Sequence, residues 1–328
     1  MQCIITIDTE GDNQWDLSAA RATENLRFIP RFQALCDQYG FSPTYLCTYD
    51  VVESPAFDEV LLPLHRGARA EIGAHLHPWT TPPSSESDRG ERGFAYPSEL
   101  PVDVFTAKLE RLTERLAGKL GERPTSYRAG RWGFSAEHIG PLLRLGYRVD
   151  CSVTPLQHWT DAGARGSGQD FTDAPVHPYV LDAKDVTREG TSGLLEVPVT
   201  ILHVNGLMRQ VPALRIAYRR YRRTLPARVL NRAFDTAPRW FRPFADMTAA
   251  RLIEVYETAR RLGLPVVEMM FHSSELMPGG SPHNPTAADV DRLYARLEPV
   301  FAHLTRERVQ GSTLTAFAES FDRARKSG

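Results

Sequence analysis

Short apolar segments of the kind that form buried strands alternate with helical patterns along most of this chain. The segments typical of strands are 3–8, 44–47, 70–75, 126–129, 147–151, 194–199 and 266–271. The segments with helical periodicity are 19–38, 60–66, 102–120, 136–145, 248–262, 287–303 and 312–320. Strands that alternate with helices form a parallel sheet, because each connection must cross back over the sheet. The chain is therefore predicted to be an α/β protein whose parallel sheet is open or closed into a barrel.

The bulk composition is that of a soluble globular protein. The chain has 328 residues, of which 42% are hydrophobic and 24% are charged, and its net charge is −1. This charge gives no overall field that favours nucleic acid or a membrane. No apolar run reaches the roughly 20 residues of a membrane span, and no secretory leader is recognised at the N-terminus. The four scattered cysteines, without a Cys-x-x-Cys pair, favour buried thiols, and we expect a cytoplasmic location.

Two histidines one residue apart follow the third strand-like segment. Side chains two residues apart in a strand share a face, so His75 and His77 can direct two imidazoles at one point. Two neutral imidazoles and a carboxylate are a common ligand set for a catalytic metal with an open position. Core or surface histidines without a metal are the alternative interpretation of this pair.

Polar side chains cluster just after five of the predicted strands. They are Asp8 and Glu10, His75 and His77, Arg128 and Arg131, Asp150 and Ser152, and His272 and Ser273. The active sites of parallel α/β folds form at the carboxyl ends of the strands. The five strand ends together therefore predict a functional site at that edge of the sheet.

Five segments resemble, in order and spacing, the motifs of the polysaccharide deacetylase family, also known as the NodB-homology or carbohydrate esterase family 4 fold. They are 6–10 (TIDTE), 71–75 (EIGAH), 127–130 (YRAG), 147–152 (YRVDCS) and 270–273 (MFHS). The resemblance covers most of the chain and implies a single catalytic domain over residues 1–328. It also implies a distorted (β/α) barrel of about seven parallel strands that hydrolyses N-acetyl groups on sugars.

The resemblance implies a metal site, but this sequence departs from the family pattern at two ligand positions. The family's second aspartate is replaced by Thr9. Glu10 shares a strand face with Asp8 and is the expected replacement, although Asp12 stays open as an alternative. The family's second histidine lies four residues after the first, where this chain has Trp79. The expected ligands of a divalent metal, zinc in the first place, are therefore Glu10, His75 and His77.

The resemblance also implies roles in amide hydrolysis. Asp8 is the expected general base, and Arg128 would orient it through a charge-assisted hydrogen bond. His272 would protonate the departing amine, because the pKa of an imidazole lies near working pH. By analogy with the family, Asp150 is the expected carboxylate partner of His272. Glu275 is either a second partner of His272 or a solvated loop carboxylate.

Aromatic and basic residues beside the motif strands are candidates for substrate binding. Tryptophan side chains can stack on the apolar face of a sugar ring, or they can simply pack the rim of the barrel. The expected substrate-binding residues are Trp79, Trp132 and Arg131.

Residues 205–247 are predicted to be a basic and aromatic helical insertion. A run of arginines extends from Arg219 to Arg223, and Arg239-Trp240-Phe241-Arg242 follows it. A solvated arginine-rich helix is one interpretation. Peripheral contact with phosphorylated or lipid-linked sugars or an anionic membrane, or with a second subunit, is the other. Recognition of a nucleic-acid sequence is not expected, because the overall charge is near zero.

The sequence thus predicts a metal-dependent hydrolase that removes N-acetyl or similar acyl groups from a carbohydrate or glycoconjugate. Two alternatives stay open. One is a C–N hydrolase of the same fold that acts on a small non-sugar amide. The other is an inactive relative that binds a glycan or a partner protein.

Overall fold

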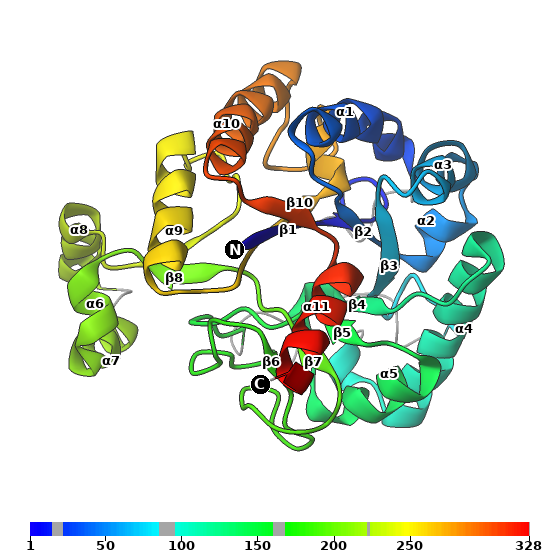
Figure 1. Cartoon of the computed structure of the whole chain (residues 1–328), viewed down its shortest axis with the longest axis horizontal. Helices are drawn as coiled ribbons and strands as arrows, with labels where there is room; N and C mark the ends of the chain where they lie inside the picture. The colour runs from blue at the N-terminus through cyan, green and yellow to red at the C-terminus, as the bar shows by residue number, and fades with distance from the viewer. Residues whose placement is uncertain (15–21, 85–95, 160–167, 222–223, 328) are drawn as a thin grey trace.

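A strongly curled, mostly parallel sheet forms the centre of the computed structural model, and helices surround it (Figure 1). The structure describes residues 1–14, 22–84, 96–159, 168–221 and 224–327. The parallel strands follow one another in the order β10 (Val266–His272), β1 (Gln2–Thr9), β2 (Thr44–Cys47), β3 (Glu71–Leu76), β4 (Ser126–Ala129), β5 (Val149–Asp150) and β7 (Leu195–Glu196). The predicted (β/α) barrel is therefore confirmed, as a distorted and incompletely closed one.

Two short strands and the extended segment around Thr200 add to the barrel wall. Strand β6 (Tyr179–Val180) pairs antiparallel with β7, and β11 (Gln310–Ser312) pairs parallel with the first residues of β1. Between β7 and β10, the N–H of Thr200 donates to the carbonyl oxygen of Glu268 at 3.3 Å. The Thr200 hydroxyl in turn accepts a hydrogen bond from the N–H of Glu268 at 2.8 Å. Thr200 thus links the segment after β7 to β10, although β7 and β10 themselves do not pair.

Amphipathic helices cover the outer face of the sheet. They are α1 (Ile29–Tyr39), α2 (Tyr49–Glu53), α3 (Leu62–Arg66), α4 (Val102–Leu120), α5 (Ile139–Leu145), α9 (Ala249–Arg261) and α10 (Ala287–Arg306). Helix α4 has the predicted bounds, and Gly121 ends it in the left-handed conformation at φ 82°. The helix predicted over 19–38 begins later, because a 3₁₀ turn at Glu24–Phe28 precedes α1, and residues 19–21 lie outside the described part.

The period of two along each strand separates an inner core from an outer one. Ile4, Leu46, Val149 and Cys151 belong to the inner core, which Leu314 and Phe317 of α11 (Leu314–Ser327) complete. The larger outer core lies between the sheet and the helices. Because apolar side chains fill the amino-terminal part of the barrel, polar groups gather towards its carboxyl end.

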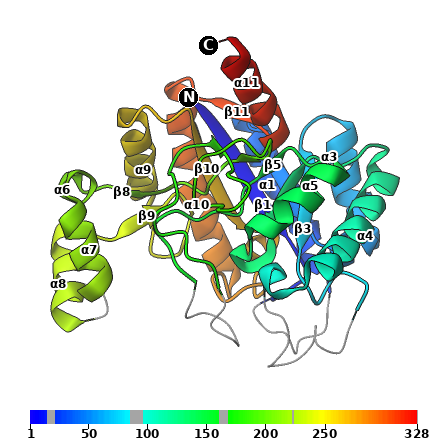
Figure 2. The ribbon, with the colours of Figure 1, turned by 90° about the horizontal axis from the view of Figure 1, so that it is seen from below.

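Three helices stand apart from the barrel at one end of the molecule, as Figures 1 and 2 both show. They are α6 (Gly206–Gln210), α7 (Pro212–Tyr221) and α8 (Leu225–Phe234), and they lie between β8 (Ile201–His203) and β9 (Pro238–Trp240). The antiparallel pairing of β8 with β9 brings the two ends of this segment together. The residues predicted as a helical insertion therefore contain helices, although Arg222 and Arg223 lie outside the described part of the chain.

We expect Gly73→Ala to destabilise the protein by about 1–3 kcal/mol, because β3 lies closely against its neighbours at this position. A Cβ on Gly73 would overlap the hydroxyl and the carbonyl oxygen of Ser126, and it would lie 2.7 Å from Leu46 Cδ2. Gly118→Ala is the control, because that helical glycine has open space around it and the change should stabilise by up to about 1 kcal/mol. Urea unfolding of both variants measures the difference, and equal stabilities would contradict this account of the packing.

We expect the buried imidazole of His138 to make stability depend on pH. Its ring stacks on Phe105 at 3.8 Å between centroids, and burial lowers the pKa of His138 to about 3. Below the ordinary histidine pKa of about 6.5 the unfolded chain binds a proton that the folded chain does not, so stability falls as pH falls towards 3. From pH 7 to pH 5 the wild type should lose about 2 kcal/mol more free energy of unfolding than His138→Phe does. Urea titrations at both pH values test this, and parallel losses in the two proteins would refute it.

Candidate active site

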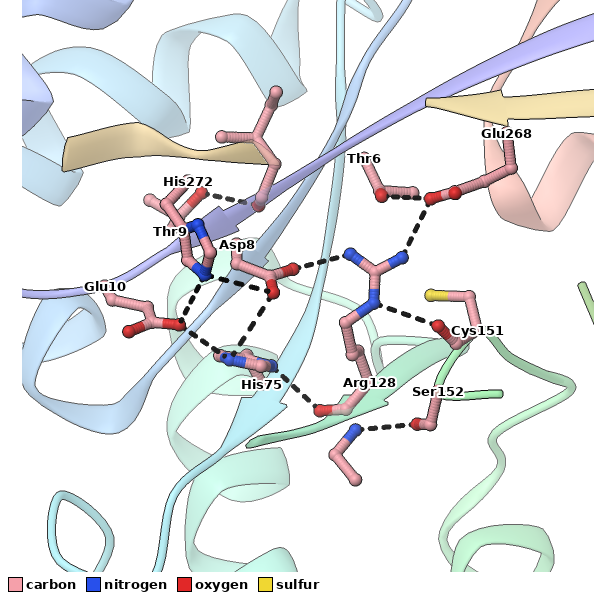
Figure 3. A network of polar contacts seen from close by, with 12 residues as sticks. Thr6, Asp8, Thr9, Glu10, His75, Arg128, Cys151, Ser152, Glu268 and His272 are labelled. Carbon is pink, nitrogen blue, oxygen red and sulfur yellow. Dashed lines mark hydrogen bonds and ion pairs between the residues drawn. The ribbon is translucent and has the colours of Figure 1, made fainter. Parts of the chain in front are cut away.

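A buried guanidinium joins three parts of the barrel. Arg128 of β4 donates from Nη1 to Asp8 Oδ1 at 2.6 Å, from Nη2 to Glu268 Oε1 at 2.8 Å and from Nε to the carbonyl of Cys151 at 2.9 Å (Figure 3). Burial alone would raise the pKa of Asp8, but the charge of Arg128 outweighs it and lowers that pKa. Asp8 is therefore held as a carboxylate, and the predicted pairing of Arg128 with Asp8 is present in the structure.

Glu10 and His75 meet at the inner face of the barrel. The Nδ1 of His75 lies 3.0 Å from the carbonyl oxygen of Arg128, which only accepts, so Nδ1 carries the proton. The opposite ring nitrogen, Nε2, lies 2.9 Å from Glu10 Oε1 and 3.9 Å from Asp8 Oδ2. A neutral His75 would therefore direct a lone pair at a carboxylate, so a second proton or a metal cation must lie at Nε2.

The pKa shifts of Glu10 and His75 indicate that positive charge is stabilised between these two side chains. Burial lowers the pKa of His75, but Asp8 and Glu10 outweigh it and raise the pKa above its usual value. Burial alone would raise the pKa of Glu10, but the imidazoles of His77 and His75 outweigh it and lower that pKa well below its usual value. A buried carboxylate that faces two imidazoles is suited to bind a divalent cation.

The second histidine reaches the same carboxylate. Its Nε2 lies 3.3 Å from Glu10 Oε1, and burial lowers the pKa of His77 to about 4, which keeps the ring neutral. The ring packs on Gly130, where a Cβ would overlap the imidazole. Among the described residues, no hydrogen-bond partner reaches the buried Nδ1 of His77. The glycine after β4 thus creates the space that the His77 ring occupies.

Glu10, His75 and His77 fit a divalent metal. One ligand atom from each lies within 4.8 Å of the others, and all three side chains are buried. The carbonyl oxygen of Arg128 accepts a hydrogen bond from His75 Nδ1 and so orients the ring. Metal-bound imidazoles usually donate their other N–H to a group of this kind. Asp12, the alternative ligand, instead accepts hydrogen bonds from the N–H groups of Glu24 and Asn25 at 3.1 and 3.0 Å. In the structure it is thus Glu10, not Asp12, that meets the two histidines.

The partner of His272 is Glu275, and its predicted pairing with Asp150 is wrong. His272 Nδ1 lies 2.9 Å from Glu275 Oε1, which also accepts from Arg242 Nη2 at 2.6 Å. His272 Nδ1 also lies 3.1 Å from Arg242 Nη2, a group that only donates, but its contact with the carboxylate is the shorter one, so we assign the Nδ1 proton to the Glu275 side and Nε2 to the cavity side. His272 Nε2 lies 3.9 Å from both Asp8 and Glu10.

Asp150 lies on the other face of the sheet. Val149 and Cys151 point into the barrel core, so the side chain between them points outwards. There it accepts from the hydroxyl and the N–H of Ser152 at 2.7 and 3.0 Å and contacts Glu196. Burial raises the pKa of both carboxyl groups, so Asp150 and Glu196 hold a proton between them. Asp150 therefore belongs to a buried carboxyl pair outside the candidate site.

A cavity of about 380 Å³ opens over these groups. Asp8, Glu10, His77 and His272 lie at it, and so do the three residues predicted to bind substrate, Trp79, Trp132 and Arg131. Three tryptophans form one cluster, in which the Trp132 ring lies 6.4 Å from that of Trp159 and 6.1 Å from that of Trp240. The guanidinium of Arg131 lies over the Trp79 ring at 4.9 Å. The cavity thus joins an apolar aromatic wall to a polar floor.

The loop after β4 presents two of these wall residues in an unusual backbone conformation. Arg131 and Trp132 have φ values of 53° and 63°, in the left-handed region that side chains other than glycine seldom adopt. Such strain is characteristic of functional loops.

Sequence reasoning missed two groups of this site, Glu268 and Arg242, and left a third, Glu275, open. Glu268, a single charge within an apolar strand and on the same face as His272, was a usable signal. Glu275 was recognised only as one of two interpretations. Arg242 gave no signal, because nothing in the sequence shows that residue 242 returns to the cavity.

No model of a known protein family matches this chain, and no curated protein matches it. Solved structures do resemble it. A putative polysaccharide deacetylase from Mycobacterium smegmatis is 17% identical with a TM-score of 0.51, covering 99% of this chain and 91% of that chain. The 4-alpha-glucanotransferase from Thermococcus litoralis is 13% identical with a TM-score of 0.51, covering 96% of this chain but 40% of that chain.

A weaker likeness is to a family 4 carbohydrate esterase from Streptomyces lividans, which is 9% identical with a TM-score of 0.42 over 95% of this chain and 91% of that chain. At such identities the likeness concerns the fold. The predicted resemblance is confirmed at the level of the fold: the chain has the distorted barrel that is also found in the putative polysaccharide deacetylase, at 17% sequence identity.

We expect Glu10→Gln to weaken zinc binding at least about 100-fold, because loss of a ligand should cost no less than loss of an outer-shell partner. Asp12→Asn is the matched control and should keep the wild-type affinity, because Asp12 caps a turn. Competition with a chromophoric chelator measures both affinities. If Asp12→Asn lost the metal and Glu10→Gln kept it, the ligand assignment would be reversed.

Proposed function

We propose that this protein is a divalent-metal-dependent hydrolase that removes N-acyl groups, in the first place N-acetyl, from a carbohydrate. The observation that supports this most is the meeting of Glu10, His75 and His77 with Asp8 and His272 at one cavity. These residues come from β1, β3 and β10 and the turns after them, which are far apart in the sequence. The shared fold supports the class of substrate but does not identify it.

The cation would be held by Glu10, His75 and His77, and two imidazoles with a carboxylate form a ligand set used by catalytic zinc. When bound, the cation lowers the pKa of water and polarises the amide carbonyl. The protein groups that remain must then remove one proton and supply another.

Asp8 is placed to act as the general base. One carboxylate oxygen is fixed by Arg128, and the other lies 3.9 Å from the Nε2 atoms of His75 and His272. Because the pKa of Asp8 is lowered, the carboxylate is ionised at neutral pH and ready to accept a proton from the attacking water.

His272 is placed to act as the general acid. Glu275 fixes Nδ1, so Nε2 faces the cavity, where the nitrogen of the departing amine would lie. Glu275 is itself held by Arg242 and by the N–H of His272 at 3.1 Å. In this protein the orienting carboxylate thus follows the histidine in the same turn.

The cavity wall suits a saccharide. Trp79, Trp132 and Trp159 line it and offer apolar ring faces, while Arg131 and His283 add polar groups. A volume of about 380 Å³ is within the range of small-ligand sites. A small non-sugar amide would leave most of this aromatic surface unused.

We expect Asp8→Asn and His272→Ala each to lower kcat/KM for acetate release by about 10²- to 10⁴-fold, because each removes one member of the acid–base pair. Both variants should keep their fold. Asp291→Asn, at an exposed ion pair with Arg31, is the control and should keep full activity. The substrates are a panel of N-acetylated sugars and sugar nucleotides, assayed with the zinc-loaded protein.

The same assay separates the rival functions. Hydrolysis confined to small non-sugar amides would overturn the carbohydrate assignment. Binding of glycans without any release of acetate, by protein that contains metal, would overturn the assignment as a hydrolase. Undiminished activity after chelation would show that the metal is not required.

A further inference from the structure

The helical segment that stands apart from the barrel has an extreme charge. No acidic residue occurs between positions 197 and 234, whereas residues 207–234 contain eight arginines. Because the whole chain has a net charge of −1, the rest of it carries nine more negative than positive charges. The segment is therefore a positive end on an otherwise negative protein.

Helix α7 turns two of its arginines inwards and leaves an isoleucine exposed. Arg219 turns towards the body of the protein, where it pairs with Asp173 at 2.9 Å, and Arg215 donates to the carbonyls of Met208 and Arg209 at 3.1 and 2.7 Å. Ile216 is instead 63% exposed, and no residue of α7 is buried. A helix that packs against its own protein normally buries its apolar side, so this apolar side suits an external partner.

The neighbouring helices also expose apolar side chains. Leu225 and Val229, one turn apart on α8, are 75% and 68% exposed, and Phe234 at its end is also exposed. Leu207 of α6 adds another exposed apolar side chain. We define the projecting surface as Leu207, Leu214, Ile216, Leu225, Val229 and Phe234, together with the exposed Arg220.

We propose that the projecting surface binds peripherally to an anionic lipid bilayer. Basic helices with exposed aliphatic side chains can lie in a membrane interface, where the aliphatic groups enter the acyl region and the arginines meet anionic headgroups. Charge complementarity selects this occupant over a symmetric dimer through the projecting surface, because such a dimer would bring the two positively charged segments together. Five of the six apolar side chains of the projecting surface are aliphatic and offer no stacking surface for the bases of a nucleic acid.

The arrangement suits attachment rather than insertion across the membrane. The three helices project from one end of the molecule, clear of the barrel (Figures 1 and 2). Within the described residues, no helix is both long enough and apolar enough to cross a bilayer. The projecting surface would therefore rest on one leaflet.

The test is co-sedimentation of the full chain with lipid vesicles. We expect binding to vesicles of phosphatidylcholine with an equal part of phosphatidylglycerol, little binding to phosphatidylcholine alone, and weaker binding as salt rises. Ile216→Ser with Val229→Ser should weaken binding about tenfold or more, and so should Arg220→Glu. All these positions are exposed, so the variants should fold, and circular dichroism checks that they do.

Matched controls lie on α4, which is not part of the projecting surface. Val102→Ser removes a side chain that is also exposed, and Arg111→Glu makes the same change in net charge as Arg220→Glu. Both controls should bind vesicles as the wild type does. Absence of binding to anionic vesicles, equal binding to neutral ones, or equal losses in the controls would overturn the proposal. A dimer that the Ile216→Ser and Val229→Ser changes dissociate would instead assign the surface to self-association.

Because vesicle binding is measured without substrate, its outcome is independent of the hydrolytic activity proposed above.

Discussion

The buried guanidinium of Arg128 is the interaction on which the candidate site depends. Its side chain holds Asp8 and Glu268, and its carbonyl oxygen accepts from His75. One residue therefore orients the proposed base and one proposed metal ligand together. A fully buried cation is stable only when its hydrogen bonds replace its lost hydration, and breaking such a pair typically costs about 3–5 kcal/mol. The contacts of Arg128 with β1, β10 and the end of β5 meet that requirement and also fix the strands relative to one another.

The charge balance around Arg128 explains why the site favours a cation. Asp8 is compensated by Arg128, and Glu275 is compensated by Arg242. Among the residues that the structure describes, no guanidinium forms an ion pair with Glu10, which instead faces the imidazoles of His75 and His77. Its negative charge is therefore available to a divalent metal. The neutral imidazoles can bind the same metal without adding positive charge to the site. The barrel thus separates the carboxylate that we propose as the proton acceptor from the one that we propose as a metal ligand.

The sequence was sufficient for the parts of the site that depend on local periodicity. The period of two in a strand placed Asp8 with Glu10 and His75 with His77, and in the structure these four side chains lie close together. The same rule, applied to Val149, would have excluded Asp150 from the barrel interior. Family analogy outweighed it and led to the wrong partner for His272.

Other features depend on contacts between distant parts of the chain, which periodicity does not contain. The pairing of β8 with β9 returns the chain from the projecting helices to the barrel, and only this return places Arg242 beside Glu275. The start of α1 was also misplaced, because a 3₁₀ turn stabilised by the carboxylate of Asp12 occupies residues that have a helical pattern. In both cases a tertiary contact decides the local structure.

This return of the chain also links the projecting helices to the cavity. Strand β9 follows α8 closely, and its last residue, Trp240, packs against Trp132 and Trp159 in the aromatic wall. Arg242 then holds the carboxylate that orients His272. A short stretch of chain, half-buried in β9 and buried at Phe241 and Arg242, therefore connects the projecting helices to the cavity.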